Sequence, residues 1–291
     1  MTAEAWTVLG GSATGRTHIT AGIGCQDAHA WFVGGRTCCL AVADGAGSRP
    51  RSAAGSVAAV ESAVQTVRAA AASAVPSVEE LFDEARARLE ALASDEGCDL
   101  DEFATTLAVV VITDDATEVG QVGDTIAVVR DEGGALRAIA PAEKFEYANE
   151  TTFLSGRSWR DHLRVERLAS SSLSGVALST DGLRFKILDD LTEGTPFAPF
   201  FEDVFAWFDS DAATPDAVAR FIDRLDDQSG DDKTLVVGAR RGTGDQQQEL
   251  YVVNQHVAEW SVDTMPPAPD QGGQMPGAEN GHGDETADSS V

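Results

Sequence analysis

Aspartate flanks four short apolar runs in this chain. They are Leu40 to Ala43 before Asp44, Val119 to Gly123 before Asp124, Val176 to Thr180 before Asp181, and Thr234 to Gly238 after Asp231 and Asp232. Carboxylates at the ends of buried strands supply the hard oxygen ligands that Mg and Mn prefer. Isolated aspartates such as Asp114 and Asp189 are better explained as turn or helix-capping residues. The repeated pattern predicts a metal site whose strongest candidate ligands are Asp44, Asp181 and Asp231.

A glycine-rich segment near the start suggests a different chemistry, nucleotide binding. Residues Gly10 to Thr17 nearly match a phosphate-binding P-loop, but Arg16 stands where the loop needs lysine. The next residues, His18 to Gly24, are β-branched and interrupted by glycine, so the helix that a P-loop requires is not expected. We interpret this segment as a plain strand and turn.

Composition indicates one main folded domain with a distinct end. A chain of 291 residues with 43% hydrophobic content can bury a substantial core. From Asp263 onward the sequence is rich in Pro, Gly, Gln, Asp and Glu and has no apolar period. The sequence therefore predicts a domain over residues 1–262 and a disordered acidic tail over residues 263–291.

Charge and targeting signals limit the partners. A formal net charge of -27 argues against binding nucleic acid or an anionic membrane surface through a basic patch. This acidity fits a high-salt cytoplasm or a GC-rich genome equally well. The chain has no apolar run of the roughly 18 residues that a membrane span needs. Its first residues lack a secretion signal, so a cytoplasmic location is expected.

The four cysteines, Cys25, Cys38, Cys39 and Cys98, show no CxxC spacing. Adjacent residues of a strand point to opposite faces, so Cys38 and Cys39 are not expected to pair with each other. All four are interpreted as reduced core residues.

The order of the predicted elements defines the fold class. Strands are predicted at Trp6–Gly10, Ala30–Val33, Thr37–Ala43, Thr105–Thr113, Glu118–Arg130, Leu163–Leu168, Gly175–Ser179 and Thr234–Ala239. Helices are predicted at Ala53–Ala74, Val78–Leu92, Phe200–Phe208 and Pro215–Leu225, with Ser77 and Glu80 spaced as a capping box. Hairpin turns are expected at Asp114-Asp115 and Gly133-Gly134. Strands and helices in grouped blocks indicate an antiparallel α+β sandwich rather than a doubly wound parallel sheet.

An ordered set of motifs resembles a known family. The set is Cys25-Gln-Asp27-Ala28, Ala43-Asp44-Gly45-Ala-Gly47-Ser48, Phe103-Ala-Thr-Thr106-Leu107, Val122-Gly123-Asp124-Thr125, Leu178-Ser-Thr-Asp181-Gly182-Leu183 and Asp231-Asp232-Lys-Thr234. Over roughly residues 7 to 240 the chain resembles the type 2C serine/threonine protein phosphatases of the metal-dependent PPM family. Gly15 to Asp27 and Glu146 to Thr151 are similar to its compact bacterial branch.

The resemblance implies a four-layer α-β-β-α sandwich with a binuclear Mg or Mn site at one end and a weaker third ion. Asp44 matches the carboxylate that bridges two ions, and Gly45 matches a backbone carbonyl ligand. Asp181 and Asp231 match further ligands, and Asp124 matches the residue associated with the third ion. By the same resemblance, Asp27 matches the acidic position that supports the metal-bound water network, which makes it a candidate catalytic residue. Asp232 stands where relatives often carry Asn.

One departure from the family concerns the substrate phosphate. Many relatives hold it with an arginine five residues before the acidic position of the first motif, and here that position is Gly22. Arg16 and His18, expected at a strand end before Asp27, are the candidate catalytic replacements. For His18 a structural hydrogen-bonding role is an equal alternative. The segment Pro141 to Arg160 is expected to form a loop near the site.

Two functions follow as hypotheses. The first is Mg/Mn-dependent dephosphorylation of phosphoserine and phosphothreonine in proteins by a monomeric phosphatase that opposes a cognate serine/threonine kinase. Its chemistry would use a metal-bound hydroxide. The second is a catalytically weak module that binds phosphoproteins and regulates them. The number of carboxylates gathered at one point favours the phosphatase, because a binding module has no need for such repulsion. A kinase or ATPase would require the weak P-loop and finds no support.

Overall fold

The computed structural model describes residues 5–139, 151–191, 193–208, 210, 213–225, 228–241 and 250–253. All of them belong to one structural unit that spans Met1–Val257. The predicted tail over residues 263–291, and residues 141–150 of the expected loop, lie outside the described part.

Two antiparallel sheets form the centre of the unit. The six-stranded sheet has the order β13-β2-β3-β4-β5-β8, and the five-stranded sheet has the order β1-β12-β9-β6-β7. The strands of the first are β13 (Leu250–Val253), β2 (Asp27–Gly34), β3 (Thr37–Asp44), β4 (Leu107–Ile112), β5 (Ala116–Val122) and β8 (Arg164–Ala169). Those of the second are β1 (Ala5–Ala13), β12 (Lys233–Arg241), β9 (Leu173–Ser179), β6 (Ile126–Asp131) and β7 (Leu136–Ile139).

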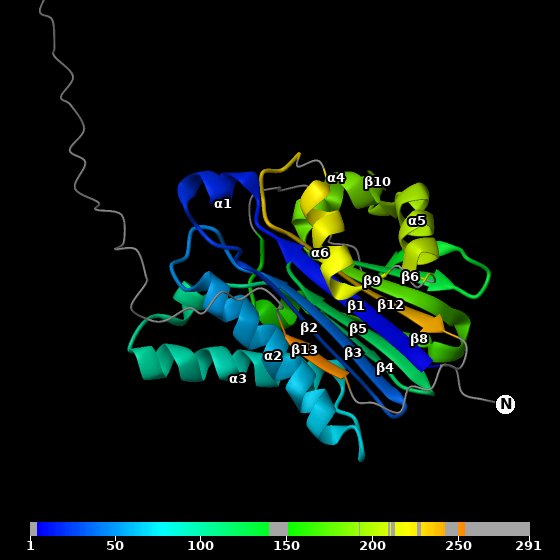
Figure 1. Cartoon of the computed structure of the whole chain (residues 1–291). Coiled ribbons are helices and arrows are strands. Elements are labelled where there is room, and N and C mark those ends of the chain that lie inside the picture. Colours follow the sequence, from blue (N-terminus) through cyan, green and yellow to red (C-terminus); the bar gives the residue numbers. More distant parts are fainter. Residues whose placement is uncertain are drawn as a thin grey trace, which may run out of the picture. The chain divides into compact units, whose positions relative to one another are not determined.

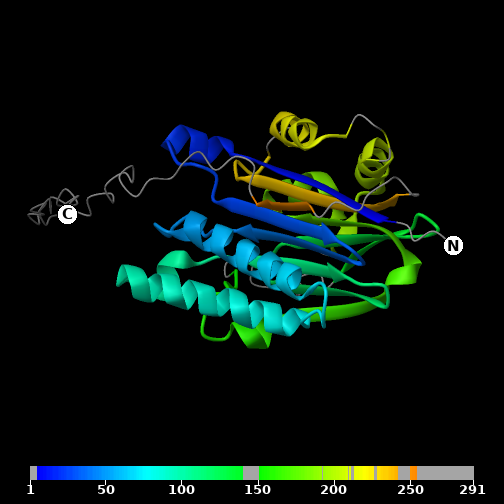
Figure 2. The same cartoon turned by 60° about the horizontal axis from the view of Figure 1, so that its bottom comes forward.

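Helices cover the outer faces of both sheets (Figures 1 and 2). The helices α2 (Ser52–Ala70) and α3 (Val78–Glu96) pack on the six-stranded sheet. On the other side, α5 (Ala198–Phe208) and α6 (Pro215–Arg224) pack on the five-stranded sheet, near the short α4 (Arg184–Ile187) and the small hairpin of β10 (Leu188–Asp190) and β11 (Thr195–Pro196). The expected α+β sandwich with four α-β-β-α layers is confirmed.

Strand alternation divides the apolar side chains among three layers. Cys39 packs under α2 and α3, whereas its neighbour Cys38 packs between the two sheets, as the period of two requires. Trp31 and Leu40 also belong to the layer between the sheets. All four cysteines are free thiols, as expected, although Cys25 and Cys98 are only partly buried.

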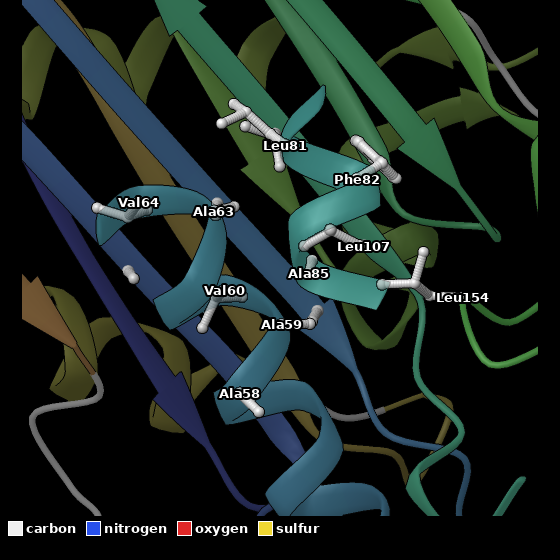
Figure 3. Packing of buried hydrophobic residues seen from close by; sticks show 14 of the residues in the cluster. Ala58, Ala59, Val60, Ala63, Val64, Leu81, Phe82, Ala85, Leu107 and Leu154 are labelled. Atoms are coloured by element: carbon white, nitrogen blue, oxygen red, sulfur yellow. The ribbon is translucent and has the colours of Figure 1, made fainter. Parts of the chain in front are cut away.

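The α2–α3 pair follows its sequence closely. The Ser77 side chain accepts the Glu80 amide and the Glu80 side chain accepts the Ser77 amide, which confirms the capping box. Small residues such as Ala59 and Ala63 let α2 approach α3 near Phe82 and Ala85 (Figure 3). The helix α2 ends at Ala70 rather than at the expected Ala74. No described helix is long and apolar enough to cross a membrane.

Two predicted elements were wrong. Residues Arg16–Ala21 form a short helix, α1, instead of the expected strand and turn, and Gly22 ends it with a left-handed φ of 69°. Glycine after a helix is a common stop signal, so it does not break this helix but terminates it. The single strand expected over Glu118–Arg130 is two strands, because Gly123, with φ of 101°, turns the chain from one sheet into the other.

Candidate active site

The register of β2 and β3 places two predicted site residues together. Asp27 is the direct cross-strand partner of Asp44 at one end of the six-stranded sheet. Both share the parity of Trp31 and Val42, which pack between the sheets. The two carboxylates therefore lie at the end of the sandwich, on its inner side.

The other predicted ligands come from the same end of the sandwich. Asp124 lies in the crossing between β5 and β6, Asp181 follows β9 after Thr180, and Asp231 precedes β12. Asp44, Asp124, Asp181 and Asp231 line one cavity of about 350 Å³, together with the predicted Gly45. A second cavity, of about 510 Å³, lies at the opposite end of the strands and is lined by mixed charges such as Arg36 and Glu118.

Close backbone approaches fix these loops. A Cβ atom on Gly182 would lie 1.8 Å from the carbonyl oxygen of Asp232, and one on Gly15 would lie 2.3 Å from that of Asp231. Only glycine fits at such separations. The loops that carry Asp181 and Asp231 are thus locked against each other and against the start of α1.

Asp27 is held by a chain of buried hydroxyl groups. Its Oδ2 accepts hydrogen bonds from Thr180 Oγ1 at 2.7 Å and from Thr234 Oγ1 at 2.8 Å. Ser12 Oγ continues the chain, lying 2.7 Å from Thr234 Oγ1 and 2.8 Å from His29 Nδ1. The buried Oδ1 of Asp27 has no hydrogen-bond partner among the described residues. That oxygen is therefore available to a water or a cation.

Asp232 acts as a structural centre under the cavity. Its Oδ1 accepts the Gly15 amide at 2.8 Å, and its Oδ2 accepts the Gln26 amide at 2.6 Å and lies 2.8 Å from His18 Nδ1. The amide of Gly15, which a P-loop would direct at a phosphate, is thus used by a carboxylate. The rejection of a nucleotide site agrees with this contact, although the helix that follows does form.

The two candidate phosphate-binding residues have different surroundings. His18 is buried and lines the cavity while its Nδ1 faces Asp232. Arg16 is exposed on α1 and is not one of the described residues that line the cavity. The structure therefore brings His18 to the site and leaves Arg16 at its margin.

Several site residues were missed by sequence reasoning. Thr180, Thr234 and Ser12 hold Asp27, and the buried Oε1 of Gln26 has no partner among the described residues. Thr151 donates to Asp124 Oδ2 at 2.9 Å. Hydroxyl residues are common in strands and loops, so only the adjacency of Thr180 and Thr234 to predicted ligands offered a signal.

Burial and mutual repulsion disfavour the charged form of these carboxylates when no cation is bound. Burial raises the pKa of Asp27 and of Asp44 well above the usual range, and for Asp44 the charges of Asp27 and Asp181 add to the rise. Burial, followed by the charges of Asp124 and Asp231, raises the pKa of Asp181 to about 6. The pKa of Asp231 is raised as well, mainly by burial. Binding of a multivalent cation would therefore stabilise the charged form of these carboxylates.

The donor set fits a hard divalent ion. Every candidate ligand offers oxygen, which suits Mg or Mn. In addition, the buried Oδ1 of Asp27 and Oε1 of Gln26 have no hydrogen-bond partner among the described residues. Within the described residues, no three His, Cys, Asp or Glu side chains form a group that could hold a metal ion by themselves. Ions bound here would complete their coordination with water, as Mg commonly does.

Comparison with known proteins agrees with the fold. The sequence profile of the family Protein phosphatase 2C matches residues 14–223. The chain belongs to the protein phosphatase 2C family.

Individual relatives extend this result. "Serine/threonine-protein phosphatase 3" of Escherichia coli is 28% identical over 255 residues, which cover 80% of this chain and 97% of that protein. The serine/threonine phosphatase Stp1 from Staphylococcus aureus superposes with a TM-score of 0.56 at 14% identity, over 83% of this chain and 96% of that one. RsbX, solved in complex with magnesium, gives a TM-score of 0.50 at 16% identity, over 83% and 98%.

Proposed function

We propose that this protein phosphatase hydrolyses phosphoserine and phosphothreonine in proteins and depends on two Mg or Mn ions, with a weaker third. The observation that carries the proposal is the cavity in which Asp44, Asp124, Asp181 and Asp231 converge. The serine/threonine specificity in the name of the Escherichia coli relative and the magnesium bound to RsbX support it. A phosphorylated protein would be the substrate and a serine/threonine kinase the opposing enzyme.

The residues divide the work of such a reaction. Asp44, Asp181, Asp231 and the Gly45 carbonyl would hold the two main ions, and Asp124 the third. Bound divalent ions would neutralise the phosphate dianion and lower the pKa of a water, so that hydroxide is available near neutral pH.

Asp27 would orient that water. Its Oδ2 is fixed by Thr180 and Thr234, which leaves Oδ1 to accept a hydrogen bond. A carboxylate held in this way keeps one orientation throughout the reaction, which lowers the cost of reorganisation. The remaining proposed roles belong to Arg16 or His18, either of which would supply a donor to the substrate phosphate or its leaving oxygen.

A measurement of turnover distinguishes the phosphatase from the alternative, a catalytically weak phosphoprotein-binding module. Hydrolysis of a small aryl phosphate is measured with Mn or Mg, with and without chelator. Asp44→Asn and Asp231→Asn are each expected to lower kcat by at least about 100-fold, because a lost ligand weakens the ions directly. Asp189→Asn is the matched control, since Asp189 is exposed and outside the cavity. Full activity in either ligand variant, or in chelator, contradicts the proposal.

A further inference from the structure

One large apolar side chain, Phe153, lines the carboxylate cavity within the described part of the chain. The other described lining residues are charged, polar, or as small as glycine and alanine. Phe153 is half-buried, so part of its ring remains accessible. It contributes neither charge nor hydrogen bonds to the proposed chemistry.

The segment that carries Phe153, residues 151–156, is attached to the body of the domain by its middle. Leu154 is fully buried, and its amide donates to the Thr105 carbonyl at 2.7 Å. Figure 3 places Leu154 beside Ala85 of α3 and close to Leu107. The Gly156 amide closes a tight turn by donating to the Phe153 carbonyl at 2.9 Å.

Arg86 fixes the same segment from α3. Its Nη1 donates to the Leu154 carbonyl at 2.6 Å and to the Gly156 carbonyl at 2.9 Å, and its Nε donates to Glu90 Oε1 at 2.8 Å. The Arg86 side chain is only 15% exposed. A largely buried guanidinium on two carbonyl groups restrains the backbone on both sides of the turn.

The other end of the segment meets the candidate metal ligands. Thr151 Oγ1 donates to Asp124 Oδ2, and Thr151 lines the cavity next to Phe153. Residues 151–156 therefore form a platform held by α3 at one end and by a site carboxylate at the other. Its position at the cavity is therefore fixed by contacts within the protein.

We propose that Phe153 determines specificity by contacting an apolar side chain next to the phosphorylated residue of the substrate, and that Arg86 positions it. This inference rests on the proposed phosphatase function and adds to it a substrate class, phosphopeptides with an apolar neighbour. Contact with the ring removes apolar surface from water equally in the ground state and the transition state. The preference is therefore expressed in KM rather than in kcat.

The test uses two phosphoserine peptides that are identical except for Leu or Ser on both sides of the phosphoserine. The Mn-loaded parent is expected to show a KM about tenfold lower for the Leu peptide, the effect of burying part of one aliphatic side chain. Phe153→Ala is expected to abolish this ratio, and Phe153→Leu to retain most of it. Turnover of free phosphoserine should remain unchanged in both variants.

Arg86→Gln separates positioning from direct contact. It is expected to reduce the KM ratio several-fold with little change in kcat, whereas Arg88→Gln, an exposed position on the same helix, should keep the parent ratio. A parent without preference, or a Phe153→Ala variant that keeps it, overturns the proposal. If the parent hydrolyses neither peptide, the phosphatase function fails, and peptide binding by calorimetry decides in its place. Equal Kd values for the two peptides then overturn the role of Phe153.

Discussion

His18 and Arg16 lie two residues apart on α1, yet they face different environments. The imidazole of His18 is buried against Asp232 and at the cavity wall, while Arg16 is exposed outside it. On a helix, two positions with this separation point in clearly different directions. A role for both residues at the same phosphate oxygen would therefore require α1 to move.

Kinetics on one phosphopeptide across pH distinguish these two residues. Arg16→Ala is expected to raise KM more than it lowers kcat, because a guanidinium binds the phosphate in the ground state and the transition state alike. His18→Ala is expected to lower kcat in a pH-dependent way through loss of a proton donor to the leaving oxygen. His18→Gln is the control that can still donate to Asp232. Parent behaviour of both alanine variants at every pH would show that neither side chain holds the phosphate.

The raised pKa values of the carboxylates predict how the metal-free protein responds to pH. The pKa of Asp181 is about 6 in the folded protein against 3.8 ordinarily, so the folded state binds a proton more tightly than the unfolded state. The stabilisation from that proton is complete below the unfolded pKa and is lost as pH rises through the folded pKa.

Melting in chelator at pH values between about 4 and 7 tests this sign. Relative to Asp181→Asn, the Tm of the parent is expected to fall across this window and to end lower by at least about 3 °C, the effect of roughly 1 kcal/mol in a domain of this size. Asp44→Asn should also raise the metal-free Tm at neutral pH, since it relieves the same repulsion. If the Tm values of the parent and of Asp181→Asn change in parallel with pH, the raised pKa of Asp181 is refuted.

At the scale of elements, periodicity predicted most of the sandwich. The strand predicted at Thr37–Ala43 is β3, which extends one residue further to Asp44, and apolar spacing with a capping box correctly predicted the start of α3 at Val78. Alternation alone could not show that the run from Glu118 to Arg130 changes sheets at Gly123, because its apolar period continues through the crossing. The chain reverses direction at this crossing, yet Val119 before it and Ala127 after it both pack between the sheets, so the period of two is not interrupted.

The candidate site was predictable only in part for a similar reason. Asp44 and Asp181 stood out because each follows an apolar run, and the structure brings both to one cavity. The supports of Asp27 come from Thr180, which follows β9, and from Thr234 on β12, both of which belong to the other sheet and lie far along the chain. Such contacts depend on strand order, and a single sequence does not give strand order.

The crossing between the sheets offers a test with a matched control. Gly123 and Gly134 both have positive φ, but a Cβ on Gly123 would lie 2.5 Å from a Thr106 side-chain carbon, whereas Gly134 has open space around it. Gly134→Ala is expected to cost about 1 kcal/mol of unfolding free energy for backbone strain alone. Gly123→Ala should cost at least about 2 kcal/mol, because the clash adds to the strain. Urea unfolding measures both, and equal costs would show that Thr106 simply moves aside.

At the scale of the whole molecule, β13 is the last element of the chain that the structure describes. Strand β13 completes the edge of the six-stranded sheet by pairing with β2, which carries Asp27. Its Tyr251 accepts a hydrogen bond from Gln65 on α2 and lies under the guanidinium of Arg68. These contacts tie residues 250–253 to the core.

Two truncations compare β13 with the predicted tail. Deletion of residues 264–291 is expected to leave Tm and aryl phosphate turnover unchanged, because that segment has no apolar pattern with which to join a core. Deletion of residues 242–291 removes β13 as well and should lower Tm by several degrees, since it opens the edge beside β2. A loss of stability in the shorter deletion would show that the tail docks on the domain.

The pairing of β1 with β12 governs when this enzyme can first work. Ala5 pairs with Arg241 and Ala13 with Lys233, so β1 can pair only after synthesis has reached β12, which lies far along the chain. The hydrogen bond from the Gly15 amide to Asp232 likewise needs the later residue, and the cavity that Asp44 lines needs Asp231. Contacts between such distant positions form slowly and late in the folding of a nascent chain. A chain released early would carry Asp27 and Asp44 but no complete cavity, so phosphatase activity reports that synthesis has passed β12.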